Sequence, residues 1–543
     1  MNPATTPGIA VAGTFTLDAV TEPMAVVLAK EAPGRSVAAA PYGQVLEALH
    51  DPGSALMTNT GVNVLLLRLA DFVRGGGLAE LGERADAMVG ELVTVLADIP
   101  NHSVATWFVA VLPSSPSVAA DAALDRWVRE AGERITAAVA TTPGVHPVAL
   151  DTLAELYDVG EVHDEYADRI GHLPYTDEYC AALATWLVRL AVSSWTKPKK
   201  VVVLDCDNTL WAGVCGEDGP TGIRVTDAHR RLQEFMLAQR AGGKLLCLCS
   251  RNNEADVEEV FAANTGMVLS WDDVTAHRIG WHPKAHSLRE LADELDLALG
   301  SFIFVDDDAV ECASVRAQLP EVATLELSRD GEQIRRQLDH AWAFDQLSTT
   351  DEDRLRADWY ATRDERSALR DASADYQDFL DRCAIEIDFV DLGDDGLERA
   401  AQLTARTTQF NLAGAVHSVP QLRALLAGSG RGWLVRVRDR FGDYGVVGLV
   451  VAERHDDAVE LPVFLLSCRV LNRRVEQEVL RFVASHAETI GASRILLPVR
   501  PTARNAPARL FVEQATGVAL GADDAPTTVS IPVGDLAPQP ADR

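Results

Sequence analysis

The chain has 543 residues and a formal net charge of −31, with 47% hydrophobic and 24% charged residues. A field of this sign repels polyanions, which argues against nonspecific binding to nucleic acid or to an anionic membrane. No run of about 18 apolar residues predicts a membrane span, and no basic leader is recognisable at the amino terminus. The eight cysteines form no C-x-x-C pair, which argues against a disulfide framework or zinc site and suits a reducing cytoplasm. We therefore expect a cytoplasmic protein of about three domains, because single cores rarely exceed roughly 250 to 300 residues.

The first segment, residues 1–195, alternates short apolar runs with helical patterns, as expected for an α/β layer. Near its end, Asp168 and His172 are candidates for a catalytic pair, but their spacing is wrong for one. We favour a capped loop that leads into a helix over 177–193. The candidate strands of this segment are 36–40, 62–69 and 106–112, and the candidate helices are 78–96 and 121–141.

An apolar run, Val201–Leu204, ends in two carboxylates, Asp205 and Asp207. Aliphatic residues without polar alternation are typical of a strand buried on both faces of a parallel sheet. Open α/β sheets bind ligands at the carboxyl ends of such strands. Two like charges so close are unfavourable unless a cation compensates them, and Mg²⁺ is suited to this role. For this segment alone, a solvated acidic turn is the simpler alternative.

Three later segments also place polar side chains at the end of a strand or the start of a helix. A hydroxyl can hold a phosphate oxygen, and an ammonium at a helix start can neutralise phosphate charge. Each feature alone has a simple alternative as a cap, a surface charge or a turn, but four of them in one βα series exceed what coincidence explains. They are Ser250 and Arg251 after the run 244–249, Lys284 before the helical pattern 287–297, and Asp306 and Asp307 after the run 301–305.

The last third of the chain predicts a further α/β domain. A charged stretch, 346–381, predicts a helical linker, and residues 536–543 predict a flexible tail. Between them, residues 382–535 alternate strand and helix patterns in an order that resembles the acetyltransferase (GNAT) fold. The candidate strands are 385–390, 432–437, 445–452, 458–466 and 494–498, and the candidate helices are 418–427 and 475–490.

The strand-end residues resemble the motifs of the haloacid dehalogenase (HAD) superfamily of aspartate-nucleophile phosphotransferases. The pattern DxDxT at 205–209 is followed by Ser250, Lys284 and an Asp-Asp pair. Longer stretches, such as DCDNTLWAGVCGEDG, WHPKAHSLRELA, RTTQFNL and LLSCRVLNRRVE, resemble the FkbH-like family of polyketide and related pathways over nearly the whole chain. The resemblance implies an SGNH-hydrolase-like domain at 1–195, a capless HAD-like core at 196–345 and a GNAT-like domain at 382–535.

The activity that the resemblance implies is transfer of a D-glyceryl unit from 1,3-bisphosphoglycerate to the phosphopantetheine thiol of an acyl carrier protein, with loss of phosphate. In the superfamily mechanism Asp205 is the nucleophile, and Asp207 is the general acid and then the base. Mg²⁺ is expected at Asp205, the backbone carbonyl of Asp207, and Asp306 or Asp307. The residues expected to bind phosphate are Thr209, Ser250, Arg251 and Lys284.

Cys215 lies in a glycine-rich flap, residues 211–222, that follows the first two carboxylates. A thiolate is a strong nucleophile toward the mixed anhydride of an acyl phosphate. We therefore hypothesise that Cys215 attacks the donor carbonyl, forms a glyceryl thioester and passes it to the carrier. The alternative is a small apolar flap residue without a chemical role.

The first and third domains depart from their families. Residues 13–16 read Gly-Thr-Phe-Thr where a Gly-Asp-Ser nucleophile is sought, so we expect no hydrolysis there. The GNAT loop Arg-x-x-Gly-x-Gly has Asn472 and Arg474 at its glycine positions, which argues against acyl-coenzyme A, because side chains obstruct close backbone approach. The cationic residues Arg469, Arg473 and Arg474 are instead candidates for docking an acidic carrier.

Two other functions fit parts of the pattern. A plain Mg²⁺-dependent phosphatase would make Cys215 dispensable and need no carrier. A scaffold without activity would dock carrier proteins but has little need for four phosphate-site motifs. Three residues differ from the usual family pattern: Ala212 replaces Gly, Arg251 replaces Lys, and Asp308 replaces Asn.

Overall fold

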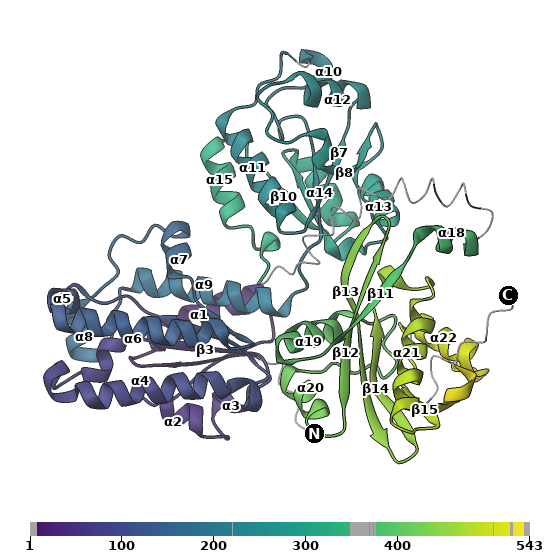
Figure 1. Ribbon diagram of the computed structural model, residues 1–543. Coiled ribbons are helices and arrows are strands. Elements are labelled where there is room, and N and C mark those ends of the chain that lie inside the picture. Colours follow the sequence, from purple (N-terminus) through teal and green to yellow (C-terminus); the bar gives the residue numbers. More distant parts are fainter. Residues whose placement is uncertain are drawn as a thin grey trace. The chain divides into compact units, whose positions relative to one another are not determined.

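The computed structural model describes residues 8–219, 221–347, 369, 373, 376–502, 504–521 and 525–536. The chain divides into two compact units, residues 1–239 with 246–348 and residues 240–245 with 349–543. The first unit holds two parallel sheets and the second holds one mixed sheet (Figure 1). The predicted linker 346–381 lies mostly outside the described residues, and so does nearly all of the predicted tail 536–543.

The first sheet has the strands β1 (Ile9–Gly13), β2 (Val37–Ala39), β3 (Val62–Leu67), β4 (Thr106–Val111) and β5 (Val145–Pro147), in the order β2-β1-β3-β4-β5. Its strand pairs are parallel. The helices are α1 (Asp18–Glu31), α2 (Val45–His50), α3 (Ala55–Thr58), α4 (Gly77–His102), α5 (Pro116–Ala120), α6 (Ala122–Thr141), α7 (Leu150–Leu156), α8 (Glu165–Gly171) and α9 (Asp177–Trp195).

Successive residues of β1 face two separate cores. Ile9 and Val11 belong to a core with α1 and α9, whereas Ala10 and Ala12 belong to a core with α4 and α6. This alternation is the geometry of a strand covered by helices on both faces. The sheet is therefore the α/β layer that the sequence predicts, although β1 and β5 were not among the predicted strands.

The second sheet has the strands β6 (Val201–Leu204), β7 (Leu245–Ser250), β8 (Val274–Ile279), β9 (Phe302–Asp306) and β10 (Ala323–Glu326), in the order β10-β9-β6-β7-β8. Its helices are α10 (Cys215–Asp218), α11 (Asp227–Ala241), α12 (Glu254–Ala263), α13 (Lys284–Leu295), α14 (Ala309–Gln318) and α15 (Gly331–Asp339). The chain runs from β6 to β7 on one side and returns to β9 on the other, so the order reverses at β6. Open parallel sheets bind ligands at such a switch point, beyond the carboxyl ends of the strands.

The third sheet has the strands β11 (Glu386–Asp391), β12 (Arg431–Asp439), β13 (Gly442–His455), β14 (Ala458–Leu466), β15 (Arg494–Val499) and β16 (Thr527–Pro532), which neighbour one another in chain order. Its helices are α18 (Tyr376–Cys383), α19 (Leu397–Arg406), α20 (Val419–Leu426), α21 (Val475–Thr489) and α22 (Ala506–Thr516). The strand pairs are antiparallel except β14 with β15, which is parallel. This order and pairing agree with the predicted GNAT-like fold.

The parallel strands β14 and β15 pair only over 458–460 and 494–496. Further along, the chain's own segment 410–412 takes the place beside β14. Leu412 N donates to Phe464 O (3.1 Å), Leu466 N donates to Phe410 O (3.0 Å), and Arg500 N donates to Leu412 O (2.9 Å). Phe410 and Leu412 are buried in the domain core. Backbone groups that a ligand would need are thus satisfied from within.

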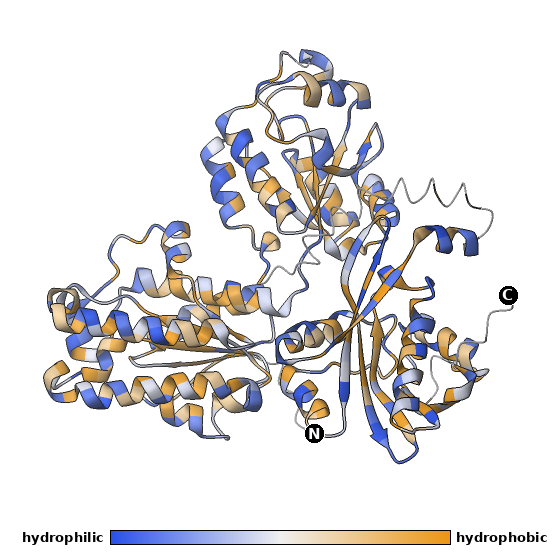
Figure 2. Ribbon diagram, viewed as in Figure 1, coloured by the Kyte–Doolittle hydropathy of each residue, from blue (hydrophilic) through white to orange (hydrophobic). Residues whose placement is uncertain are grey.

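Hydropathy follows this layering. Figure 2 shows helices that carry both hydrophobic and hydrophilic residues around their circumference. In α6 the buried residues Val128, Ala131, Ile135 and Val139 recur at helical spacing, which places one apolar stripe on the core. In the described part of the chain, none of the helices combines the length and apolar content needed to cross a bilayer.

Candidate active site

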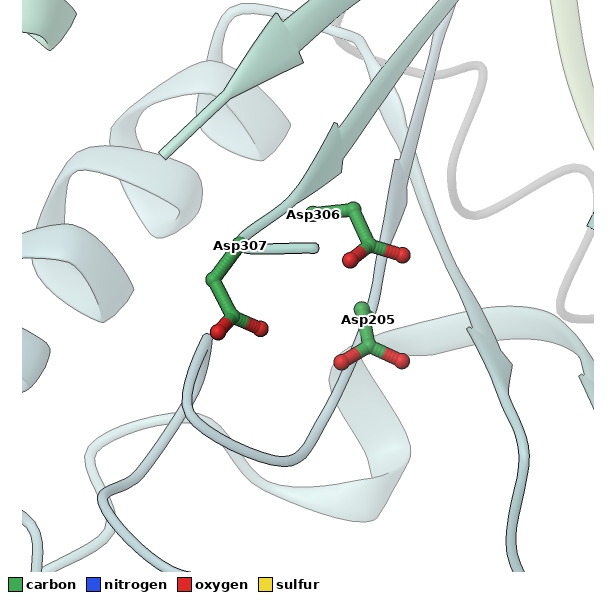
Figure 3. A group of neighbouring side chains, drawn as sticks. All are labelled: Asp205, Asp306 and Asp307. Carbon is green, nitrogen blue, oxygen red and sulfur yellow. The ribbon is translucent and has the colours of Figure 1, made fainter. Parts of the chain in front are cut away.

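Three carboxylates meet at the switch point of the second sheet. Asp205 follows β6, Asp306 is the last residue of β9, and Asp307 comes next (Figure 3). One oxygen from each lies within 4.8 Å of the others. The strands are neighbours in the sheet, so their carboxyl ends bring these residues together as the sequence predicts.

Lys284, the first residue of α13, neutralises part of this cluster. Its Nζ contacts Asp205 Oδ1, lies 3.1 Å from Asp306 Oδ2 and donates to the carbonyl of Cys249 (2.5 Å). Although burial favours the neutral amine, the charge of Asp205 raises the pKa of Lys284 above its usual value. The ammonium is therefore a fixed positive charge at the strand ends.

The cluster retains more negative charge than Lys284 compensates. Burial raises the pKa of Asp205 to about 7, although the charge of Lys284 acts in the opposite direction. Burial also raises the pKa of Asp307, against the effect of Arg329, whose Nη2 lies 2.7 Å from Asp307 Oδ2. Asp306 Oδ2 is buried, and it shares the single ammonium of Lys284 with Asp205. A group of oxygen ligands with unsatisfied charge fits a hard divalent cation.

Asp207 lies in a different network from the other carboxylates. Its Oδ1 accepts from Trp211 Nε1 (2.9 Å) and from the backbone N–H of Cys215 (3.0 Å). Its Oδ2 accepts from Asn252 Nδ2 (3.0 Å). Among the described residues, its side chain is not in the group of clustered carboxylate oxygens. The expected metal contact through the Asp207 backbone carbonyl stays a prediction.

Cys215 begins the short helix α10 in the predicted flap. The residue is 2% exposed, and its Sγ donates to Asn252 Oδ1 (3.3 Å). Burial, and after it the charge of Asp207, raises the pKa of the thiol to about 12. Glycines with positive φ flank the helix, Gly213 at 112° and Gly219 at 65°. In this conformation the thiol is protonated and shielded rather than presented to solvent.

The expected phosphate-binding residues have different surroundings. Ser250 is buried at the end of β7, and its hydroxyl accepts from Asn252 Nδ2 (2.9 Å). The Thr209 hydroxyl donates weakly to Asp307 Oδ1 (3.4 Å). Arg251 is paired with Glu311 at 2.8 Å, with its side chain about half exposed. Thr209 and Lys284 thus touch the carboxylate cluster, Ser250 is linked to Asp207 through Asn252, and Arg251 pairs with α14.

Asn252, Trp211 and Arg329 contact the site but were not among the expected site residues. Asn252 lies two residues after Ser250, the last residue of β7, and it is buried. A buried polar residue just beyond a strand end would have been the signal, but burial is not visible in the sequence. Arg329 contacts Asp307 from beyond the sheet, where the sequence pattern gives no indication.

The three candidate docking arginines have partners within the third domain. Arg473 contacts the Tyr444 hydroxyl and lies 3.7 Å from Asp439, while Arg474 pairs with Asp381 at 2.7 Å. Arg469 Nε donates to Ser467 Oγ at 3.4 Å. The guanidinium groups of Arg473 and Arg474 are therefore engaged in ion pairs within the second unit.

The loop before α21 keeps the backbone of a glycine loop without the glycines. Asn472 and Arg474 have φ values of 61° and 66°, in the left-handed region that glycine favours. Asn472 N donates to Glu476 Oε1 (2.6 Å), and burial raises the pKa of Glu476. An internal carboxylate therefore occupies the helix start where a pyrophosphate would be held.

The first domain also has a polar cluster at its strand ends. The Thr14 hydroxyl donates to Asp71 Oδ2 (2.9 Å), and His172 Nε2 lies 2.9 Å from Asp71 Oδ1. Asp168 pairs with Arg68 at 2.7 Å rather than with His172. A serine-type triad needs the histidine between the nucleophilic hydroxyl and the carboxylate, whereas here Asp71 lies between Thr14 and His172, and His172 Nδ1 contacts the Tyr42 hydroxyl (2.6 Å). The arrangement favours the expected capped loop, since His172 is the C-cap of α8.

No family model and no curated protein matches the chain. Among solved structures, it is similar to the N-terminal part of the protein BF1531 from Bacteroides fragilis, which contains a phosphatase domain and is complexed with Mg. The identity is 20% over 63% of this chain and 94% of that chain, with a TM-score of 0.53. The matched 63% of this chain is more than any one of its three sheets with its helices spans, so the shared fold includes more than one sheet.

Two acetyltransferases match over smaller shares. A spermidine N-acetyltransferase variant from Vibrio cholerae is 13% identical over 28% of this chain and 95% of that chain, with a TM-score of 0.21. A GNAT-family acetyltransferase from Staphylococcus aureus is 12% identical over 24% of this chain and 84% of that chain, with a TM-score of 0.20. The GNAT-like assignment rests on strand order and pairing, while the similarity to the N-terminal part of BF1531 shows a shared fold.

Proposed function

We propose that the protein transfers a D-glyceryl unit from 1,3-bisphosphoglycerate to the phosphopantetheine thiol of an acyl carrier protein, with loss of phosphate. The observation that carries the proposal is the chain of hydrogen bonds that links Cys215, Asn252, Asp207 and Ser250 beside the carboxylate cluster. An acyl-transfer thiol and a phosphate-type site are thus parts of one network. The FkbH-like resemblance supplies the substrate.

In the phosphate half, Asp205 attacks the phosphorus of the ester phosphate on glyceryl carbon 3. The P–O bond to the glyceryl oxygen breaks, Asp207 donates a proton to that oxygen, and water then hydrolyses the aspartyl phosphate. Lys284, fixed between Asp205 and Asp306, offsets negative charge on the phosphoryl group. Asp205, Asp306 and Asp307 would hold Mg²⁺, which screens the repulsion between carboxylate and phosphate.

In the acyl half, Cys215 Sγ attacks the carbonyl carbon of the acyl phosphate. The C–S bond forms, the C–O bond to phosphate breaks, and the thiol proton leaves to the surroundings with the phosphate. The carrier thiol then attacks the thioester and releases Cys215 as a free thiol. Because Cys215 is buried, this half also requires the flap between Gly213 and Gly219 to move.

The carrier is the proposed macromolecular partner. Its acidic surface would meet Arg469, Arg473 and Arg474, which would have to exchange their internal contacts for the carrier's carboxylates. Such an exchange is electrostatic, so loading rates should fall as ionic strength rises. A rate that does not change between low and high salt would count against this docking surface.

A plain Mg²⁺-dependent phosphatase is the second candidate. The observation that favours it is the shielded Cys215 thiol, whose pKa is raised to about 12 by burial and by Asp207. In that case the phosphate half acts alone and the cysteine only fills the flap.

One experiment decides between the two. The enzyme is incubated with 1,3-bisphosphoglycerate, Mg²⁺ and candidate phosphopantetheinylated carriers, and both proteins are weighed intact. Glyceryl transfer adds one glyceryl mass to the enzyme and then to a carrier. Phosphate release without either mass increase would favour the plain phosphatase.

A further inference from the structure

Asn252 occupies the junction between the two halves of the site. It lies two residues beyond the last residue of β7 and is 5% exposed. Its Nδ2 donates to Asp207 Oδ2 (3.0 Å) and Ser250 Oγ (2.9 Å), and its Oδ1 accepts from Cys215 Sγ (3.3 Å). One buried amide therefore joins the end of β7 to two groups of the earlier segment 207–215.

The chemistry of the partners fixes the orientation of this amide. Both oxygens of Asp207 accept hydrogen bonds, so the amide nitrogen faces Asp207. The amide oxygen then faces the thiol of Cys215, which must act as donor. Turning the amide over would set its oxygen against a carboxylate oxygen and cost the hydrogen bond to Asp207.

Asp207 depends on Asn252 for the donor to one of its two oxygens. Oδ1 is held by Trp211 Nε1 and by the backbone N–H of Cys215, whereas Oδ2 accepts from Asn252 Nδ2. Removing the amide leaves a half-buried carboxylate oxygen, a buried serine hydroxyl and a buried thiol each short of a partner. These groups would then be free to rotate away from their present geometry.

We propose that Asn252 is a positioning residue that holds the Cys215 thiol and the Asp207 carboxylate in fixed relation and thereby couples acyl transfer to phosphate release. This inference rests on the proposed function for its acyl half. Asn252 forms no covalent bond, and it acts through the two reacting side chains, Cys215 and Asp207, rather than on the substrate. Its contribution is geometric, and small displacements of reacting groups cost much of a rate.

The test uses the full-length enzyme with Asn252→Ala and Asn252→Asp. The aspartate keeps the shape and an acceptor for the thiol, but it loses both donors and sets a second carboxylate against Asp207. The matched control is Asn253→Ala, an exposed neighbour whose amide donates to Asp256 Oδ2 (3.1 Å) and whose side chain contacts none of the four network residues. Two assays are run with Mg²⁺: thioester formation on Cys215 by intact mass after rapid quench, and hydrolysis of p-nitrophenyl phosphate.

We expect both Asn252 variants to lower kcat in both assays by roughly 10- to 100-fold while KM changes by less than about twofold. Asn253→Ala should match the wild type. Wild-type kcat in either assay for both variants would overturn the coupling, and so would a loss confined to Asn252→Ala. If the wild type forms no thioester, the proposed function fails, and Asn252 is then judged by p-nitrophenyl phosphate hydrolysis alone.

Discussion

The HAD-like core and the GNAT-like domain both have a fold that binds ligands beside a strand end, yet their strand ends differ in how many charges they gather and in whether the chain itself fills the space. In the core, three carboxylates gather around one lysine, whose Nζ contacts Asp205 and lies 3.1 Å from Asp306 Oδ2. In the GNAT-like domain, one buried carboxylate, Glu476, accepts from the loop through Oε1 and has no hydrogen-bond partner at Oε2 among the described residues, and residues 410–412 fill the gap beside β14. Several carboxylates at one strand end gain from a cation, whereas a gap filled by the chain's own backbone leaves a ligand few free backbone groups. We therefore expect the chemistry in the core.

The strongest way to break this comparison is to remove the proposed nucleophile. Asp205→Asn should lower p-nitrophenyl phosphate hydrolysis in Mg²⁺ by roughly 1000-fold or more, because an amide cannot form the acyl phosphate bond. The control is Asp308→Asn, which caps α14 at the neighbouring position and should keep its cap and the activity. Full activity in Asp205→Asn would place the nucleophile elsewhere.

The second prediction separates the two halves of the core. Cys215→Ala should abolish the mass increase from the acyl phosphate, because no other thiol is proposed to take the acyl group. Hydrolysis of p-nitrophenyl phosphate should stay within about threefold of wild type, since alanine leaves the Asp207 contact to the backbone N–H intact. Cys468→Ala, at the exposed cysteine, serves as the control and should load normally. Normal loading of Cys215→Ala would rule out Cys215 as the group that takes the acyl unit.

The strand ends of the core could be predicted from the sequence, because an apolar run and the carboxylate that follows it are adjacent in the chain. Val201–Leu204 is a continuous apolar run, and its neighbours in a parallel sheet end at the same edge, so Asp205 and Asp306 had to meet. The role of Asn252 could not be predicted, because it depends on contacts with two other segments of the chain. Arg251 illustrates the same limit, since its partner, Glu311, lies on a helix 60 positions later.

In the GNAT-like domain, the sequence pattern does not predict the backbone conformation of the loop before α21 or the burial of residues 410–412. The missing glycines at Asn472 and Arg474 predict weak coenzyme binding, which stays a prediction, but the backbone there keeps the left-handed conformation. The segment 410–412, which fills the gap beside β14, is too short to show a hydrophobic periodicity. Its burial follows from its hydrogen bonds to distant residues of β14 and to Arg500. Similarly, β1 is a five-residue strand of small and aliphatic residues, which periodicity alone cannot tell from a loop.

A third prediction tests whether the core's charge is uncompensated. The folded pKa of Asp205, about 7, lies above its ordinary value of about 4, so folding favours the protonated form. This contribution is fully present below about pH 4 and is lost as pH rises through 7. Between pH 5 and 8 the metal-free wild type should lose a few degrees of Tm relative to Asp205→Asn. Mg²⁺ should restore Tm at pH 8 far more than at pH 5, as thermal scans with and without chelator would show.

The fourth prediction concerns backbone strain in the loop before α21. Arg474→Gly should relieve the cost of a left-handed residue and raise stability by about 1 kcal/mol, less what the ion pair with Asp381 contributes at an exposed site. Asn472→Gly should change stability less, because asparagine tolerates this conformation better. Urea unfolding measures both. A clear loss of stability in Arg474→Gly would show that its contacts outweigh its strain.

The smallest expected effect is none: coenzyme A should not stabilise the protein. A ligand at 100 times its Kd stabilises by about 2.7 kcal/mol, so a Tm that does not move at millimolar coenzyme A places the Kd in the millimolar range or above. Glu476→Gln sharpens the result, because it removes the carboxylate from the helix start but leaves Phe410 and Leu412 in the gap. If coenzyme A does not raise the Tm of the variant either, residues 410–412 are sufficient to block binding. If coenzyme A raises the Tm of the variant in a concentration-dependent way, the charge of Glu476 alone prevents binding in the wild type, and the difference between the two domains is electrostatic.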